Sequence, residues 1–193
     1  MIAYKFLTNG SRGPFTGHPW RAGVWQEAAV DLRRGTGIHA CRARDLSYWL
    51  CDELWEIEIG GDVHELETQL VASRGCLRRR VDAWGLGVAG EFARACTWRT
   101  RDRAVELLAA RGLAADAERL ADCRELSAVE STVRSLGPRI ASIGGYLADV
   151  AHFAATNMAS TCAYVAAVAA DFSGHGFKRE RSTQAQWITS ALG

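Results

Sequence analysis

Apolar and polar residues alternate most clearly over residues 55–59, where three apolar side chains are separated by two glutamates. A period of two predicts a strand with one buried face and one face in water. Shorter apolar runs predict further strands at Ala3 to Leu7 and at Ile38 to Cys41, and one or two more over residues 63–77. The sequence Gly60-Gly61-Asp62 predicts a turn directly after the clearest strand.

Other parts of the first half have weaker patterns. Residues 15–25 are rich in glycine, proline and tryptophan and predict a packed loop. Residues 44–52 predict a short helix, since Leu46, Trp49 and Leu50 would fall on one side of it.

The second half of the chain has the three- and four-residue spacing of apolar positions that predicts amphipathic helices. The predicted helices cover residues 91–111, as one long helix or two short ones, and residues 114–136, 139–172 and 180–192. The third contains an alanine stripe, whose small side chains would let another helix approach closely, for example in a homodimer. The stripe consists of Ala148, Ala151, Ala155, Ala159, Ala163, Ala166 and Ala170.

These patterns together predict an α+β fold, in which a small, mostly antiparallel sheet is followed by an Ala-rich helical bundle. We place the sheet part at residues 1–85 and the helical part at residues 86–193. The chain has 193 residues, and neither part alone would bury much apolar surface. We therefore expect the helical part to pack on the sheet part around one shared core.

Composition narrows the class of protein. The residues are 48% hydrophobic and 23% charged with a formal net charge of +1, which excludes a wholly disordered or fibrous chain. The first residues lack a signal-peptide pattern, polar residues interrupt the apolar stretch 143–172, and the six cysteines form no close pairs. These features favour a cytoplasmic, non-membrane protein with reduced thiols. The excess of arginine over lysine indicates a high-GC bacterial genome.

The near-neutral net charge conceals charged blocks. Residues 1–44 carry seven basic and two acidic side chains, residues 45–70 carry eight acidic and no basic ones, and residues 74–111 carry nine basic and four acidic ones. The favoured interpretation is that the acidic block faces the basic blocks, within one fold or across a dimer. The alternative is nucleic-acid binding through the Arg74–Arg111 block, which clustered arginines permit but do not establish.

His39 and Cys41 are the closest pair of chemically active side chains in the sequence. On an extended strand, residues two apart point to the same face, about 7 Å from each other. An imidazole at that distance could lower the pKa of the thiol and make it a nucleophile, so both residues are candidate catalytic residues. The alternatives are a contact with a ligand, or packing in a partly polar layer.

Two further sets are candidate ligand-binding residues. Asp149 and His152 share one face of a predicted helix, where the carboxylate could orient and charge the imidazole. The alternative for this pair is a satisfied buried histidine or an exposed ion pair. His18, Trp20 and Trp25 could form an aromatic wall for a ligand, or could pack in the core.

The sequence contains none of the common motifs for nucleotide binding, zinc proteolysis or kinase chemistry. The five histidines are scattered, so we expect no metal site. Nothing in the sequence identifies a cofactor.

The segments Tyr4-Lys5-Phe6-Leu7, Gly37-Ile38-His39-Ala40-Cys41 and Leu54-Trp55-Glu56-Ile57-Glu58 resemble a group of uncharacterised bacterial and phage domains. Those domains begin with a Tyr-Lys strand, carry a Gly-x-His-x-Cys step and continue with a Glu-bearing strand. The order of strands is also similar to the front half of an ADP-ribosyltransferase core, in which a Gly-Ile-Tyr-Phe-Thr type of strand lines the NAD pocket. That similarity implies a pocket near His39.

The lack of a complete catalytic set favours a soluble cytosolic binding or protein-interaction module, whose ligand is an unknown small molecule or protein. The first alternative is a group-transfer enzyme, either ADP-ribosyltransferase-like or dependent on His39 and Cys41. The second alternative is nucleic-acid binding through the Arg74–Arg111 block, which we rank last because the net charge is only +1.

Overall fold

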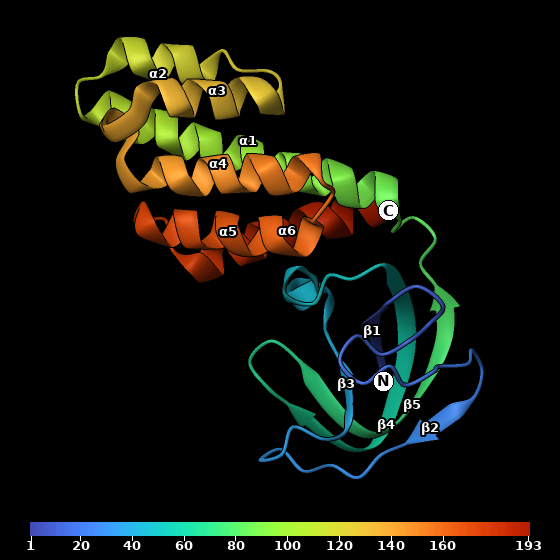
Figure 1. The fold of residues 1–193 in the computed structure, drawn as a ribbon. Coiled ribbons are helices and arrows are strands. Elements are labelled where there is room, and N and C mark those ends of the chain that lie inside the picture. Colours follow the sequence, from blue (N-terminus) through green and yellow to red (C-terminus); the bar gives the residue numbers. More distant parts are fainter. The chain divides into compact units, whose positions relative to one another are not determined.

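The computed structural model describes residues 1–193 and contains a small antiparallel sheet followed by a helical region (Figure 1). The predicted α+β fold is therefore confirmed. The chain divides into two compact units, Met1–Leu86 with Ala185–Gly193, and Gly87–Gln184. We call them the sheet unit and the helical unit. The predicted core shared between the two parts stays a prediction.

The sheet unit contains β1 (Ile2–Leu7), β2 (Trp25–Glu27), β3 (Ile38–Ala40), β4 (Glu53–Glu65) and β5 (Leu70–Arg80). The strand order is β1-β4-β5-β2, β3 also pairs with β5, and every pairing is antiparallel. The strands predicted from apolar runs near residues 3–7, 38–41 and 55–59 are thus confirmed.

The sheet closes on itself next to β3. The Tyr4 N–H donates to the Cys41 carbonyl at 2.8 Å, and the Cys41 N–H donates to the Tyr4 carbonyl at 2.7 Å. Closure creates an interior that apolar side chains fill, since alternate residues of each strand point inward. The interior cluster consists of Ala3, Leu7, Trp20, Ile38, Ala40, Ile57, Ile59, Leu70, Ala72 and Leu77.

The predicted turn at Gly60-Gly61-Asp62 is wrong, because β4 continues through it with a shift of register against β5. Such a β-bulge needs one residue with a backbone conformation that glycine adopts readily, and Gly61 has φ +70°. The Asp62 N–H, displaced from the ladder, donates to Ser73 Oγ at 2.9 Å. The strand therefore bends at the glycines instead of ending there.

Two smaller elements of the sheet unit also differ from the sequence prediction. The helix predicted over residues 44–52 is a short 3-10 helix, η1 (Ala43–Tyr48). The loop predicted over residues 15–25 leads into β2, which the sequence did not predict. A strand of three residues is too short to show a period of two.

The helical region consists of α1 (Leu86–Ala110), α2 (Ala114–Ala121), α3 (Leu126–Leu136), η2 (Gly137–Ile140), α4 (Ala141–Ala155), α5 (Ala159–Phe172) and α6 (Phe177–Leu192). Within it, α2 packs against α3, α3 against α4, and α4 against α5 (Figure 1). The helices predicted over residues 91–111 and 180–192 are confirmed as α1 and α6.

The single helices predicted over residues 114–136 and 139–172 are wrong, because each is broken in two. The second break lies at Asn157, which has φ +57°. The Met158 N–H then donates to the Phe153 carbonyl at 2.9 Å. This bond pattern ends helices, and asparagine tolerates the left-handed backbone that it requires.

The break at Asn157 changes the meaning of the alanine stripe. The helices on either side of it pack against each other, and Cys162 Sγ lies 3.6 Å from the Val150 carbonyl oxygen. Ala151, Ala163 and Ala166 of the stripe are buried within the chain. The close approach of helices that the stripe predicts therefore occurs inside one chain. A homodimer stays a prediction.

Candidate functional site

His39 lies on β3, and both nitrogens of its ring are engaged. Its Nε2 atom is 3.0 Å from the Gly35 carbonyl oxygen, to which it can donate. Its Nδ1 atom is 2.9 Å from the side-chain amide of Gln69. The imidazole is thus held between a loop and the start of β5, where it fixes local structure.

Cys41 is buried, and its thiol is not activated. Burial raises the pKa of the Cys41 thiol to about 12, and the negative charge of Asp45 adds to this effect. The positive charges of Lys5 and Arg42 act in the opposite direction but do not prevail. The expectation that His39 lowers this pKa is wrong, and the thiol stays protonated at neutral pH. The structure thus removes the basis for catalysis by a thiolate at Cys41.

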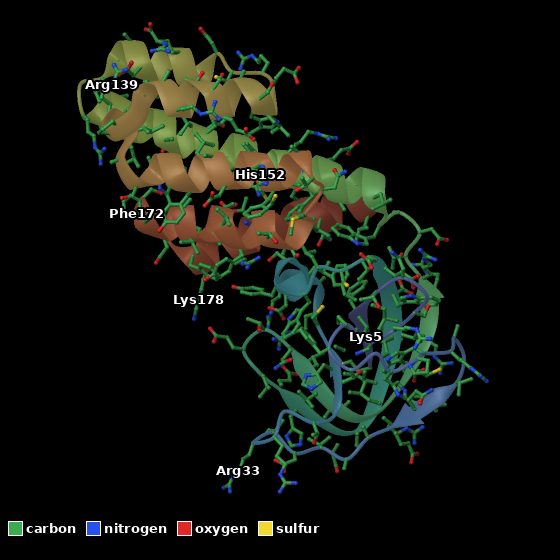
Figure 2. All side chains as sticks on the ribbon, in the orientation of Figure 1. Lys5, Arg33, Arg139, His152, Phe172 and Lys178 are labelled. Carbon is green, nitrogen blue, oxygen red and sulfur yellow. The ribbon has the colours of Figure 1, made fainter.

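Lys5, which was not among the candidate residues predicted from the sequence, is one of the charged residues that act on Cys41. Lys5 lies on β1 between Ala3 and Leu7, which both belong to the interior cluster (Figure 2). Its Nζ atom donates to the His39 carbonyl at 2.6 Å and lies 4.9 Å from the ring centroid of Trp20. It forms no ion pair. The sequence pattern could have indicated this position, because residues 3, 5 and 7 lie on the same face of the strand.

The surroundings of Lys5 favour the neutral amine. Burial lowers the pKa of Lys5 to about 8, and the nearby Cys41 only partly opposes this shift. The structure therefore brings together three of the residues singled out from the sequence, Trp20, His39 and Cys41, but around a lysine and not around a thiolate.

We expect Lys5→Met to raise the free energy of unfolding at pH 7 by about 1–2 kcal/mol, since burying an ammonium costs more than its two contacts return. The folded pKa of about 8 lies below the ordinary value of 10.5. The wild-type protein should therefore gain stability as pH rises from about 8 to about 10.5, because the unfolded chain then holds more protons. Urea unfolding of both proteins between pH 7 and 10.5 measures this. If the difference in the free energy of unfolding between the two proteins stays constant across that pH range, the prediction is contradicted.

The aromatic wall expected from His18, Trp20 and Trp25 does not form as one surface. Trp20 is buried in the interior cluster, and the exposed ring of His18 lies 6.0 Å from it. Trp25 is half-exposed on β2, with the Arg74 guanidinium 4.3 Å and the Arg78 guanidinium 5.5 Å from its ring centroid. Trp25 and Trp20 therefore have separate partners.

Arginines of the Arg74–Arg111 block have carboxylate partners within the chain. On neighbouring strands β4 and β5, Arg78 pairs with Glu58, Arg79 with Glu56, and Arg80 with Glu53. In the helical unit, Arg99 and Arg103 pair with Glu180, and Arg101 pairs with Asp102. The acidic block thus faces part of the basic block within one fold, as the favoured interpretation expected. This pairing neutralises much of the charge that phosphate binding would need.

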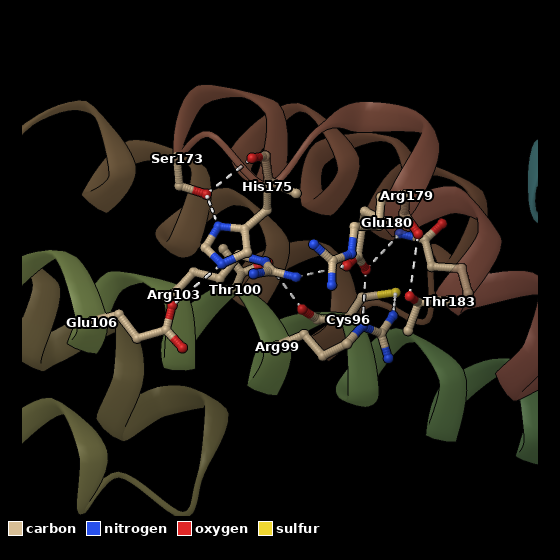
Figure 3. Close-up of polar contacts among 12 residues, drawn as sticks. Cys96, Arg99, Thr100, Arg103, Glu106, Ser173, His175, Arg179, Glu180 and Thr183 are labelled. Atoms are coloured by element: carbon tan, nitrogen blue, oxygen red, sulfur yellow. Dashed lines mark hydrogen bonds and ion pairs between the residues drawn. The ribbon is translucent and has the colours of Figure 1, made fainter.

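Glu180 is the centre of the most buried of these ion pairs (Figure 3). Its side chain is 1% exposed, and its Oε1 atom lies 2.8 Å from Arg99 Nε. Its Oε2 atom lies 3.5 Å from Arg103 Nη2, and Gln184 Nε2 donates to Oε1 at 3.1 Å. These contacts join α1 to the first half of α6, so we assign them a structural role.

Asp149 and His152 lie on α4, where they line a pocket of about 260 Å³. Figure 2 labels His152 on this helix. From α3, the pocket receives Glu130, Val133 and Arg134. No hydrogen bond or ion pair joins Asp149 to His152, so the predicted orienting contact is absent. Glu130 and Arg134 stand four residues apart and also form no ion pair.

The pocket combines charges of both signs with apolar side chains. Val133 is buried, whereas Arg134, Asp149 and His152 are exposed and Glu130 is partly buried. The Thr156 hydroxyl, which shares this helix face, donates to the backbone carbonyls of His152 and Phe153 at 3.3 and 3.1 Å and not to the imidazole, whose ring lies edge-on to the Phe153 ring at 5.6 Å. Sequence spacing could have indicated Glu130 and Arg134 as a pair, but only the packing of α3 on α4 places them beside Asp149 and His152.

Comparisons with protein-family models, with curated proteins and with solved structures found no match. No three side chains of His, Cys, Asp or Glu gather in a way that could hold a metal ion. None of the helices has the length and apolar character needed to cross a membrane.

Proposed function

We propose that the protein is a non-catalytic binding module, and that the pocket between α3 and α4 binds a small dipolar ligand. The observation that carries this proposal is the set of oppositely charged side chains around one hollow. Glu130 and Asp149 offer acceptors for an ammonium group, and Arg134 offers donors for a carboxylate. A free amino acid has both groups on one small frame.

The size of the pocket supports a ligand of this class. Its volume of about 260 Å³ lies below the usual range for drug-sized ligands, which favours a small one. A charge-assisted hydrogen bond is also worth more to binding when its protein partner is not already paired. Glu130, Arg134 and Asp149 form no ion pair within the chain, so their charges are available to a ligand.

The group-transfer alternative has less support. In the form that depends on His39 and Cys41, it needs a free imidazole or a reactive thiol, but the His39 ring is engaged on both sides and the Cys41 thiol is buried. No observation favours NAD as a ligand.

We expect titration calorimetry with a panel of free amino acids to detect binding by at least one of them. Asp149→Asn and Arg134→Gln should each weaken that binding about tenfold, since each removes one charge-assisted contact worth about 1.5 kcal/mol. Propylamine and propionate, which carry one charge each, should bind more weakly than the amino acid.

The matched control is Arg94→Gln, because Arg94 is an exposed arginine of α1 outside the pocket. This variant should bind as the wild type does. Absence of binding across the panel, or an affinity equal to that of the wild type in both the Asp149→Asn and the Arg134→Gln variant, would refute the proposal. Binding of only one of the two singly charged compounds, with no gain for the amino acid, would refute its dipolar character.

A further inference from the structure

The amino group of Lys5, in the sheet unit, is a second candidate site that does not depend on the pocket. The chain contains two lysines, Lys5 and Lys178. Lys178 is exposed on α6, whereas Lys5 is partly exposed and points into the closed sheet (Figure 2). One donor of its amino group is satisfied by the His39 carbonyl, and the Trp20 ring lies beside it.

We infer that Lys5 is a nucleophilic amine that captures small aldehydes or ketones as a Schiff base. The inference rests on an amino group that has one backbone acceptor, an aromatic neighbour and no carboxylate partner. Lysines held in apolar surroundings are more often neutral than exposed ones, and the neutral amine is the nucleophile.

The reaction balances without any further reagent. The Nζ lone pair forms a bond to the carbonyl carbon, and the carbonyl oxygen takes up a proton to give a carbinolamine. Loss of that oxygen as water then forms the C=N bond, so an amine and a carbonyl compound give an imine and water. The protonated imine is a cation, and the Trp20 ring, 4.9 Å from Nζ, can stabilise it through its π electrons.

The neighbouring groups favour this chemistry near neutral pH. The pKa of Lys5 is lowered to about 8 by burial. At pH 8, about half of such an amine is neutral, compared with about 0.4% of an ordinary lysine. Cys41 is the titratable group that acts on the Lys5 charge, and it stays a neutral thiol because its own pKa is about 12.

The test is reductive alkylation of the full chain with acetaldehyde and sodium cyanoborohydride at pH 7.5, followed by digestion and mass spectrometry. Fragment masses distinguish the two lysines from the amino terminus, so the ethylation of each amine can be measured separately. We expect Lys5 to be ethylated about tenfold faster than Lys178, because its larger neutral fraction outweighs its lower basicity. The Lys5 rate should rise with pH and level off above about pH 8.

Two variants control for access and folding. Lys5→Met should leave the Lys178 rate unchanged, and Lys178→Met should leave the Lys5 rate unchanged. Labelling of Lys5 no faster than Lys178, or only after denaturation in urea, would identify a sealed structural lysine and overturn the inference. Because Lys5 lies in the sheet unit and the pocket lies in the helical unit, neither result affects the proposed binding function.

Discussion

Replacing Glu180 with glutamine is expected to lower the free energy of unfolding by about 3 kcal/mol, because it leaves two arginines without their buried counter-charge. The carboxylate is 1% exposed and joins Arg99 at 2.8 Å to Arg103 at 3.5 Å. Glutamine keeps the shape and can still accept from Gln184, so the loss reports mainly on charge. The arginine side chains are about one-fifth exposed, which limits the loss through access to water.

Urea unfolding followed by circular dichroism measures this loss. The matched control is Glu106→Gln, which removes an exposed carboxylate of α1 that lies 3.5 Å from His175, in the turn before α6. An exposed pair of this kind contributes little, so the control should change stability by less than about 0.5 kcal/mol. Equal effects of the two substitutions would show that burial of Glu180 does not determine its contribution.

The second large effect is expected at Gly37, directly before β3. Gly37 has φ +132°, and a Cβ atom there would lie 2.5 Å from Val71 Cγ1. Gly37→Ala therefore combines backbone strain with a clash inside the sheet, and should lower the free energy of unfolding by about 3 kcal/mol. The clash should also displace β3 and weaken the contact between His39 and Gln69.

Gly35→Ala is the control for Gly37, because Gly35 also has a left-handed backbone, with φ +67°, but has open space around its Cβ position. We expect Gly35→Ala to lower the free energy of unfolding by about 1 kcal/mol, which is the effect of backbone strain alone. Thermal or urea unfolding of both variants separates the two contributions. A loss at Gly37 no greater than at Gly35 would show that Val71 moves aside at little cost.

The sheet could be predicted where its strands are long enough to alternate. The glutamates of residues 55–59 identified β4, and the short apolar runs identified β1 and β3. The continuation of β4 through Gly60 could not be predicted, because a glycine pair is compatible with either a turn or a bulge until the partner strand is known.

The helices were predictable in composition but not in number. Apolar spacing continues across Asn157, so it does not reveal that the chain reverses there. A single asparagine with a left-handed backbone ends the helix, and this choice depends on packing between α4 and α5. The alanine stripe predicted the close approach of another helix but not which one, and most of the stripe is buried within the chain.

The candidate sites were predicted only in part. Spacing on one helix face identified Asp149 and His152, but their neighbours Glu130 and Arg134 come from another helix and depend on tertiary packing. In the sheet, His39 and Cys41 were predicted to be functional because of their residue types, and Lys5 was not. The position of Lys5 between two inward-facing apolar residues was visible in the sequence and is the stronger indication.

Closure of the sheet also bears on aggregation. Unpaired strand edges are templates to which strands of other chains can add. Part of the edge of β1 is paired through the bridge between Tyr4 and Cys41, the residue that follows β3. Other open edges are the three-residue β2 and the far end of β4, where Asp62 and Glu65 place negative charge. Short and charged edges discourage growth into fibrils, so a partner of this unit would have to recognise side chains and not extend the sheet.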